Sequence, residues 1–212
     1  MQLRKYLHSC IVLEKDGKRL LIDPGTFVFI EGKMTPADIG AVDAVLITHK
    51  HADHYDPAAL KTIGAPIFTI REIGDLLANE GLTYTEIAAN DMRDIAGFSV
   101  RVIEAAHGPL PVPVPHNVAI LVDDRVLHPG DSYHPQGLER CDVLALPIIA
   151  PWAKVVEAVE FAVRMQPKVV VPIHDAFMKD FLLTRVYDMV ATALSAHNIT
   201  FRPLGMGEAI DV

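Results

Sequence analysis

The sequence predicts a layered α/β protein with a mixed sheet or two sheets. Three observations carry this prediction: apolar strand patterns crowd the first part of the chain, strand and helix patterns alternate in the last third, and the composition supports a buried core. Half of the 212 residues are apolar and 22% are charged. No Gly/Ser-rich linker divides the chain, so we expect one globular domain over residues 1–212.

The first part of the chain shows strands joined by turns and short helices. Two apolar runs, 10–13 and 19–22, flank Asp16-Gly17, which predicts a hairpin. Asp56 and Pro57 predict the cap and first residue of a helix to about residue 63. The same reasoning predicts strands over 42–48, 66–69, 98–105, 118–122 and 125–127, and a helix over 71–80 that Gly81 ends.

Strands and helices alternate in the last third. We expect strands over 143–146, 168–173, 199–202 and 209–212. A helix over 152–165 is expected to bury Val155, Val159, Ala162 and Val163, which recur at helical spacing. A second helix over 177–196 is expected to turn Phe181, Val186, Met189 and Val190 inward.

Charge and cysteine usage narrow the function classes. The chain has 19 Lys and Arg against 27 Asp and Glu, a net charge of −8, which disfavours binding to polymeric nucleic acid. Two cysteines, Cys10 and Cys141, suit a reducing compartment. Residues 1–8 lack the apolar core of a signal peptide, and no apolar run is long enough to span a membrane. We therefore expect a cytoplasmic protein without membrane partners.

The densest chemical signal is a short histidine-rich segment. His49, His51, Asp53 and His54 place four candidate ligands within six residues. Imidazole and carboxylate are the ligand types of zinc and its neighbours. His49 and His51 can point the same way in extended chain, and Asp53 and His54 follow as the chain turns. One loop can therefore serve two adjacent metal ions.

Three further candidates lie just past the ends of apolar runs. They are His107, Asp131 and His174. Open α/β folds build their sites at such strand ends. A single histidine after a strand is usually a surface or core residue, but several runs ending in ligand-type residues favour a metal site.

The spacing H-x-H-x-D-H resembles the hallmark of the metallo-β-lactamase superfamily. More narrowly, the chain resembles small metal-dependent hydrolases related to ascorbate-6-phosphate lactonase, over nearly its whole length. The chain departs from this family at two places that concern the substrate pocket. Leu7 stands where the family usually has glycine, and the Pro-rich stretch 108–117 replaces a stretch of small, Ser-rich residues. The matching segments are 6–10 (YLHSC), 20–24 (LLIDP), 128–132 (HPGDS), 146–148 (LPI) and 171–174 (VPIH).

This resemblance implies a four-layer αβ/βα sandwich, the metallo-β-lactamase fold, with a dinuclear site between the sheets. Asp131 would bridge the two ions, a feature of lactonases, thioesterases and phosphodiesterases rather than of true β-lactamases. The resemblance assigns His49, His51 and His107 to one metal, and Asp53, His54 and His174 to the other.

Such a site predicts a metal-dependent hydrolase. Two divalent ions lower the pKa of water and polarise a substrate oxygen. With Asp53, Asp131 and a bridging hydroxide the formal charge is +1, which favours a small, anionic lactone or ester-type substrate. The alternative is a phosphodiesterase acting on a small nucleotide or other phosphodiester. Zinc is the first choice of metal, with manganese, iron or nickel as alternatives, and a homo-oligomer is left open.

Several residues receive secondary assignments. His116, at the end of the Pro-rich stretch, is a candidate proton donor to the leaving group, although a solvent-facing histidine is the simpler interpretation. His8 could line the pocket, hold a ligand or be structural. Asp23 could orient a ligating imidazole or cap a turn, and we expect His128 to support the site from outside. Trp152 could form a pocket wall or serve in packing.

Overall fold

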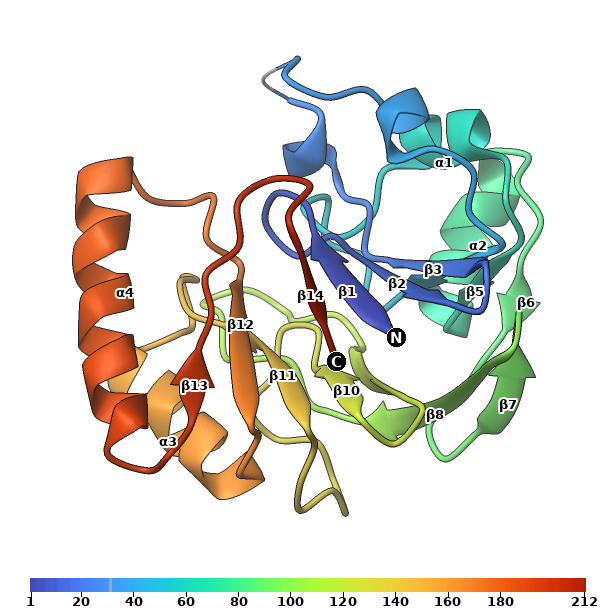
Figure 1. Ribbon diagram of the computed structural model, residues 1–212. Coiled ribbons are helices and arrows are strands. Elements are labelled where there is room, and N and C mark those ends of the chain that lie inside the picture. The colour runs from blue at the N-terminus through green and yellow to red at the C-terminus, as the bar shows by residue number, and fades with distance from the viewer. Residues whose placement is uncertain (31) are drawn as a thin grey trace.

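The computed structural model describes residues 1–30 and 32–212, and this part of the chain forms two seven-stranded β-sheets that pack face to face (Figure 1). The first sheet has the order β14 (Ala209–Asp211), β1 (Gln2–Lys5), β2 (Ile11–Lys15), β3 (Lys18–Ile22), β4 (Ala44–Ile47), β5 (Ile67–Thr69), β6 (Thr85–Glu86). The second has the order β13 (Thr200–Phe201), β12 (Val169–Ile173), β11 (Val143–Pro147), β10 (Val126–His128), β9 (Val118–Val122), β8 (Phe98–Glu104), β7 (Met92–Ile95).

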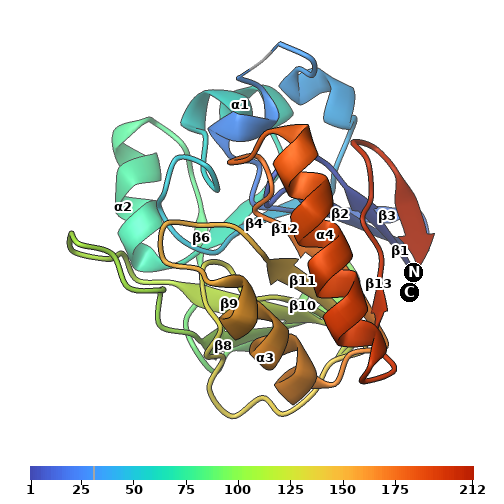
Figure 2. The same cartoon turned by 90° about the vertical axis from the view of Figure 1, so that its left-hand side faces the viewer.

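Helices cover the outer faces of both sheets. In Figures 1 and 2, α1 (Pro57–Ile63) and α2 (Arg71–Asn79) lie outside the first sheet, and α3 (Val155–Met165) and α4 (Asp180–Ser195) lie outside the second. Two short 3-10 helices, η1 (Thr26–Val28) and η2 (Pro36–Ile39), lie in the connection between β3 and β4. This order of layers confirms the αβ/βα sandwich.

The alternation of side chains along central strands builds two cores. In β11, Val143 and Ala145 join the core between the sheets, whereas Leu144 and Leu146 face the α3 side. Successive side chains of a strand point to opposite faces, so a strand buried on both faces must be apolar throughout. This explains the continuous apolar runs that predicted these strands.

The turn and cap signals of the first part are confirmed. Asp16 and Gly17 connect β2 to β3 with φ values of 51° and 74°, the left-handed pair that a tight hairpin requires. The Asp56 carboxylate accepts hydrogen bonds from the amides of Ala58 and Ala59 and so caps α1. Strand β1 was missed; it pairs with β14 and joins the two chain ends in one sheet.

Two helix starts were predicted too early. Helix α3 begins at Val155 rather than at residue 152, and α4 begins at Asp180 rather than at residue 177. In α3 the predicted residues all pack against the core, but the three valines are only partly buried. The fully buried face consists of Ala158, Phe161, Ala162 and Met165.

The expected inward face of α4 is also partly wrong. Phe181 and Met189 are 66% and 59% exposed, whereas Val190 and Leu194 are buried. The helix packs on one side only, against α3 and β13, so it buries a narrow stripe. No helix within the described residues is both long and apolar enough to cross a membrane.

Strand direction brings several strand ends to one edge. Strands β10, β11 and β12 are parallel, and β8 runs the same way because β9 is antiparallel to both β8 and β10. In the other sheet, β3 and β4 are parallel. The segments that follow these strands carry the residues of the candidate site.

Candidate metal centre

The histidine-rich segment follows β4 and is held by the turn that follows β3. Oδ1 of Asp23 accepts a hydrogen bond from the Thr48 amide at 2.8 Å, and Oδ2 accepts one from the Thr48 hydroxyl at 2.7 Å. Gly25 lies so close to this segment that an added Cβ would be 2.0 Å from the carbonyl carbon and oxygen of Asp53. A side chain at residue 25 would therefore displace the segment.

The remaining candidates follow the second sheet's strands. His107 follows β8, Asp131 follows β10 and His174 follows β12. Asn117 supports two of these connections: its amide nitrogen donates to the carbonyls of Ala105 and Pro129 at 2.8 and 3.1 Å, and its side-chain oxygen accepts from the Asp131 amide at 3.0 Å.

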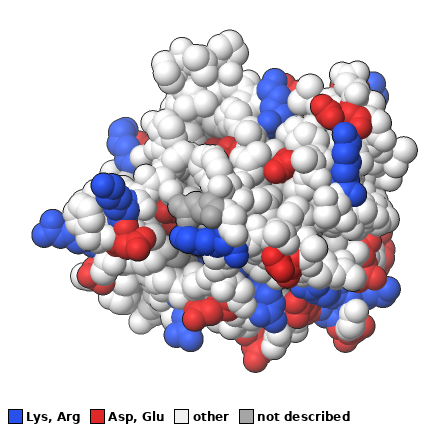
Figure 3. All heavy atoms as spheres, turned by 90° about the horizontal axis from the view of Figure 1, so that it is seen from above, with Lys and Arg blue, Asp and Glu red and all other residues white. Residues whose placement is uncertain are grey.

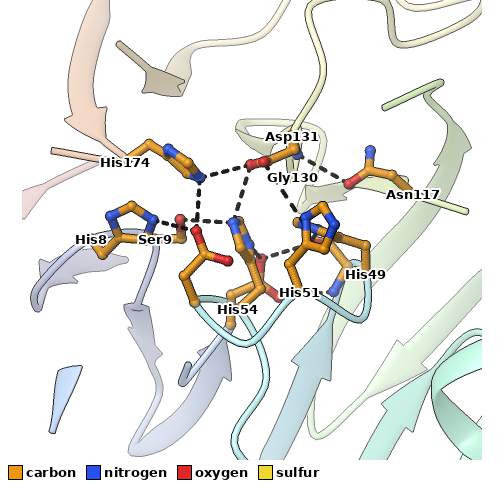
Figure 4. A network of polar contacts seen from close by, with 12 residues as sticks. His8, Ser9, His49, His51, His54, Asn117, Gly130, Asp131 and His174 are labelled. Carbon is orange, nitrogen blue, oxygen red and sulfur yellow. Dashed lines mark hydrogen bonds and ion pairs between the residues drawn. The ribbon is translucent and has the colours of Figure 1, made fainter. Parts of the chain in front are cut away.

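The structure brings together all seven sequence-predicted ligands, which follow strands of both sheets. Figure 4 labels His49, His51, His54, Asp131 and His174 among them. They fall into two groups, each with ligand atoms within 4.8 Å of one another. We call them the His107 group and the His174 group. The His107 group consists of His49, His51, His107 and Asp131, and the His174 group of His8, Asp53, His54 and His174.

In the His107 group, three imidazoles meet at a narrow point. Nδ1 of His51 lies 3.2 Å from Nε2 of His49 and 3.2 Å from Nε2 of His107. Ligands placed tetrahedrally at about 2.0–2.1 Å from one zinc ion lie roughly 3.3 Å apart. The spacing of these nitrogens therefore fits one ion.

The hydrogen bonds of the outer nitrogens show that lone pairs converge there. The Nδ1–H of His107 donates to the Gly108 carbonyl at 2.6 Å, and Nδ1 of His49 lies 3.1 Å from the Thr48 hydroxyl oxygen. Since that hydroxyl donates to Asp23, the imidazole is the donor, and Nε2 of both rings carries a lone pair. A proton on Nδ1 of His51 could form a hydrogen bond to only one of these two nitrogens. The other lone pair would lack a partner, so the three nitrogens together suit a cation.

The His174 group is arranged around two carboxylates. Oδ2 of Asp53 lies 2.9 Å from Nε2 of His8 and 3.4 Å from Nε2 of His174. Oδ1 of Asp131 lies 3.1 Å from Nε2 of both His54 and His174. His8, a secondary candidate in the sequence, thus belongs to the centre.

Asp131 faces both groups. Its Oδ2 lies 3.4 Å from Nε2 of His107, while its Oδ1 faces the His174 group. Asp131 Oδ1, His174 Nε2 and His8 Nδ1 are buried without an aligned hydrogen-bond partner. Of these atoms, Asp131 Oδ1 and His174 Nε2 face each other at 3.1 Å and indicate where a metal ion fits, whereas His8 faces Asp53 through its other ring nitrogen.

A buried carboxylate orients one of the central imidazoles. Asp23 Oδ2 accepts the hydrogen bond of His54 Nδ1 at 2.7 Å, and both side chains are fully buried. His174 is oriented in the same way by the Ile149 carbonyl, at 2.6 Å from Nδ1. An outer partner of this kind fixes the tautomer so that Nε2 faces the metal. The expected orienting role of Asp23 is thus consistent with its contacts.

Three residues of the centre and its support have backbone in the left-handed region. His8, Asp23 and His174 have φ values of 61°, 51° and 63°. The left-handed region is unfavourable for residues other than glycine, with costs of order 1 kcal/mol each. The surrounding structure holds three strained residues beside the centre, which is typical of functional sites.

The groups differ in proton affinity. Burial, reinforced by His54, lowers the pKa of His49 well below its ordinary value, and burial together with His107 lowers that of His51. Burial also acts to lower the pKa of His54 and His174, but the Asp131 carboxylate outweighs it. The pKa of His54 is raised well above its ordinary value and that of His174 to about 9.

Trp152, the chain's only tryptophan, contacts the centre directly. Its indole Nε1–H donates to Oδ2 of Asp131 at 3.0 Å, and an added Cβ on Gly108 would lie 2.2 Å from the indole ring. From the sequence, we expected Trp152 either to pack in the protein interior or to form a wall of the substrate pocket. No sequence signal identified the hydrogen bond, because Trp152 and Asp131 meet only through the loop after β11.

Other histidines lie outside the two groups. His128 Nε2 donates to the Ser9 carbonyl at 2.8 Å. His116 is exposed and contacts Glu104 Oε2 at 3.4 Å through Nε2, while its amide donates to Glu72. Its role as a proton donor stays a prediction. His134 and His197 are exposed.

Comparisons with known proteins agree on one family. A family model described as a beta-lactamase superfamily domain matches residues 2–174. Protein Rv0786c of Mycobacterium tuberculosis is 36% identical over 188 residues, covering 84% of this chain and 85% of that protein. A UPF0173 metal-dependent hydrolase of Thermoplasma volcanium is 26% identical over 184 residues, covering 79% and 80%.

A solved structure shows the same architecture. Igni18, a metallo hydrolase from Ignicoccus hospitalis, superposes with a TM-score of 0.76 at 25% identity, covering 99% of this chain and 97% of that one. The family match, the relatives and the two groups of candidate ligands agree. The chain therefore belongs to the metallo-β-lactamase superfamily, as a metal-dependent hydrolase.

Proposed function

We propose that the chain binds two divalent metal ions, one in each group, and hydrolyses a small, anionic lactone or ester-type substrate. The observation that carries the proposal is the position of Asp131, whose two carboxylate oxygens face different groups. A shared carboxylate of this kind suits a pair of neighbouring ions. Zinc is the first candidate because its ligands are imidazole and carboxylate.

The chain's own residues orient the reaction. When bound, divalent ions supply Lewis acidity that lowers the pKa of water and polarises a substrate oxygen. His8 and His174 hold Oδ2 of Asp53, and this carboxylate is partly exposed and stays ionised, so it can orient the attacking water by accepting a hydrogen bond from it. Its pKa is held well below its ordinary range by hydrogen bonds from His174 and His8, which outweigh burial.

The charge balance favours an anionic or electron-rich substrate. Four formal positive charges of two ions exceed the two negative charges of Asp53 and Asp131. His51 and Asp53 are the partly exposed members of their groups, so substrate reaches the centre from their side. The narrower likeness to relatives of ascorbate-6-phosphate lactonase stays a prediction.

The test is a metal count beside a substrate panel. We expect close to two ions per chain, measured by mass spectrometry of the purified protein, and hydrolysis of lactones or esters that a chelator abolishes. A panel of lactones, thioesters and small phosphodiesters distinguishes the candidates. Turnover confined to phosphodiesters would replace the ester proposal with phosphodiesterase activity, and full activity in the metal-free protein would refute both.

Two variants test the arrangement. Asp131→Ala and His49→Ala should each lower kcat/KM by about a hundredfold or more, since losing a ligand exceeds the effect of losing an outer partner. His197→Ala is the matched control, because this histidine is exposed and outside both groups. Full turnover in either ligand variant would contradict the dinuclear proposal.

A further inference from the structure

A cavity of about 690 Å³ lies beside the His174 group. Two of its lining residues are chain neighbours of candidate ligands: Leu7 precedes His8 and Asp175 follows His174. A volume of this size is in the range of small-molecule sites, roughly 300–1,000 Å³. The cavity therefore has both the size and the position of a substrate subsite.

An aromatic wall borders both the cavity and the centre. Phe27 and Phe177 line the cavity, and their ring centroids lie 5.3 Å apart. Both rings also contact the His8 imidazole, at 4.9 and 5.1 Å. Phe177 is 45% exposed, so this wall borders both the centre and the solvent. A ligand in the cavity would lie one aromatic ring away from the His174 group.

The cavity combines apolar side chains with a small buried polar cluster. Ile30, Leu183 and Leu204 are among its apolar lining residues. Figure 3 shows the molecule from above, with charged side chains of both signs scattered over this face. A ligand that fills such a cavity gains most of its affinity from burying apolar surface.

The polar cluster consists of Lys5, Asp175 and Tyr187. Nζ of Lys5 lies 2.8 Å from Oδ2 of Asp175, and the Tyr187 hydroxyl donates to the same oxygen at 2.8 Å. The side chains of Lys5 and Asp175 are only 3% and 6% exposed. Oδ1 of Asp175 is buried without a hydrogen-bond partner. Burying an ion pair is costly, and an unsatisfied acceptor beside it costs more, so packing alone does not explain this cluster.

The charges that line the cavity favour a neutral ligand group over a charged one. Lys5 already neutralises Asp175, and the other charged lining residues, Lys33 and Asp180, are one of each sign. A charged ligand group would therefore gain no net attraction, whereas a neutral hydroxyl could donate to the Asp175 carboxylate, which lines the cavity.

We propose that this cavity binds the uncharged, non-reacting part of the substrate, an apolar chain or ring that carries a hydroxyl group recognised by Asp175, Lys5 and Tyr187. This inference rests on the proposed function for the reacting end of the substrate. Together they describe an amphipathic substrate with an electron-rich reacting group at the metal centre and a hydroxylated apolar group in the cavity.

The first test measures binding without metal or turnover. Hexan-1-ol and 1-methoxypentane have the same formula, but only the alcohol can donate a hydrogen bond. In NMR titrations we expect the protein to bind hexan-1-ol about fivefold more tightly, the effect of one hydrogen bond. Tyr187→Phe should reduce this preference, because it removes one of the two groups that hold the Asp175 carboxylate. Equal binding of the two compounds by the wild-type protein would overturn the hydroxyl recognition.

Filling the cavity locates the binding site. Leu183→Trp places a large ring in the cavity and should weaken hexan-1-ol binding by about tenfold or more. Leu182→Trp is the matched control, since the neighbouring residue is 40% exposed and does not line the cavity. Met178→Trp, at a half-buried lining position, is a second filling variant if the first does not fold. Equal binding by a folded filling variant and the control would place the site elsewhere.

Turnover then connects the cavity to the reaction. For the metal-loaded enzyme, Leu183→Trp should lower kcat/KM for p-nitrophenyl hexanoate relative to p-nitrophenyl acetate by about tenfold, while the acetate value changes less than about twofold. If neither ester is hydrolysed, ester chemistry fails, and the titration still tests the cavity. If acetate is hydrolysed and the ratio does not change, the cavity is not a substrate subsite.

Discussion

The His107 group and the His174 group each offer three imidazoles and one carboxylate, but their outer partners differ. In the His107 group the outer nitrogens contact neutral oxygens, the Thr48 hydroxyl and the Gly108 carbonyl. In the His174 group, His54 contacts the buried Asp23 carboxylate. An anionic partner makes an imidazole a stronger base and ligand. The environment, rather than the donor set, therefore distinguishes the two halves of the centre.

The same difference governs protonation before metal binding. His49 and His51 have lowered pKa values and are neutral ligands at pH 7. His54 and His174 have raised pKa values, so both are protonated there and must lose their protons to bind a metal. One half of the centre is ready for a cation, whereas the other half exchanges protons for one.

Among the variants, Asp23→Asn is expected to change the difference in metal affinity between the two groups the most. Removing the negative charge should weaken metal binding in the His174 group by about 10–100-fold, the usual effect of losing an outer partner. The His107 group should lose much less affinity, because Asp23 reaches it only through Thr48. Competition titrations with a chromophoric chelator measure both affinities.

Asp142→Asn is the control for Asp23→Asn, since Asp142 pairs with Lys168 on the surface, away from both groups. An equal loss of affinity in the two groups would show that the outer carboxylate does not distinguish them.

The second prediction concerns pH. Because protons must leave His54 and His174, metal affinity of the His174 group should rise with pH between about 6 and 8, by roughly tenfold per pH unit for each proton displaced. The dependence should weaken above pH 9, where His174 is deprotonated. Affinity of the His107 group should change little over the same range. Chelator competition at several pH values, with proton release followed by calorimetry, checks this, and two parallel curves would refute it.

The smallest effect is expected from Trp152→Phe. This variant removes the hydrogen bond to Oδ2 of Asp131, the oxygen that faces the His107 group. We expect kcat/KM to fall about fivefold, corresponding to roughly 1 kcal/mol for one hydrogen bond. The metal affinity of the His107 group should fall more than that of the His174 group.

Tyr133→Phe is the matched control for Trp152→Phe. The Tyr133 ring packs on Trp152, but its hydroxyl donates to the Pro147 carbonyl and does not reach Asp131. A similar loss in both variants would mean that packing, rather than the hydrogen bond, positions Asp131.

Local sequence signals predicted much of the fold because they act over a few residues. Asp16-Gly17 and Asp56-Pro57 determine a turn and a helix start through backbone geometry and caps that need no distant partner. The seven predicted ligands could be identified because each lies directly after an apolar strand or within one short motif. That they bind metal remains the proposal tested above.

Long-range contacts account for what the sequence did not reveal. Phe181 and Met189 have the helical spacing of a buried face, yet α4 is covered on only one side. For His8 the sequence left a pocket, a ligand-holding and a structural role open, and only the structure places it in the His174 group, 166 positions before His174 in the chain.

The sequence by itself determined the positions of most strands, the turns and the types of ligand, since these depend on neighbouring residues and side-chain chemistry. Only the tertiary structure decided which oxygen of Asp131 faces which group, that Trp152 donates to it, and that Lys5 and Asp175 meet in the wall of a cavity. These arrangements depend on the packing of two sheets, which no stretch of sequence encodes alone.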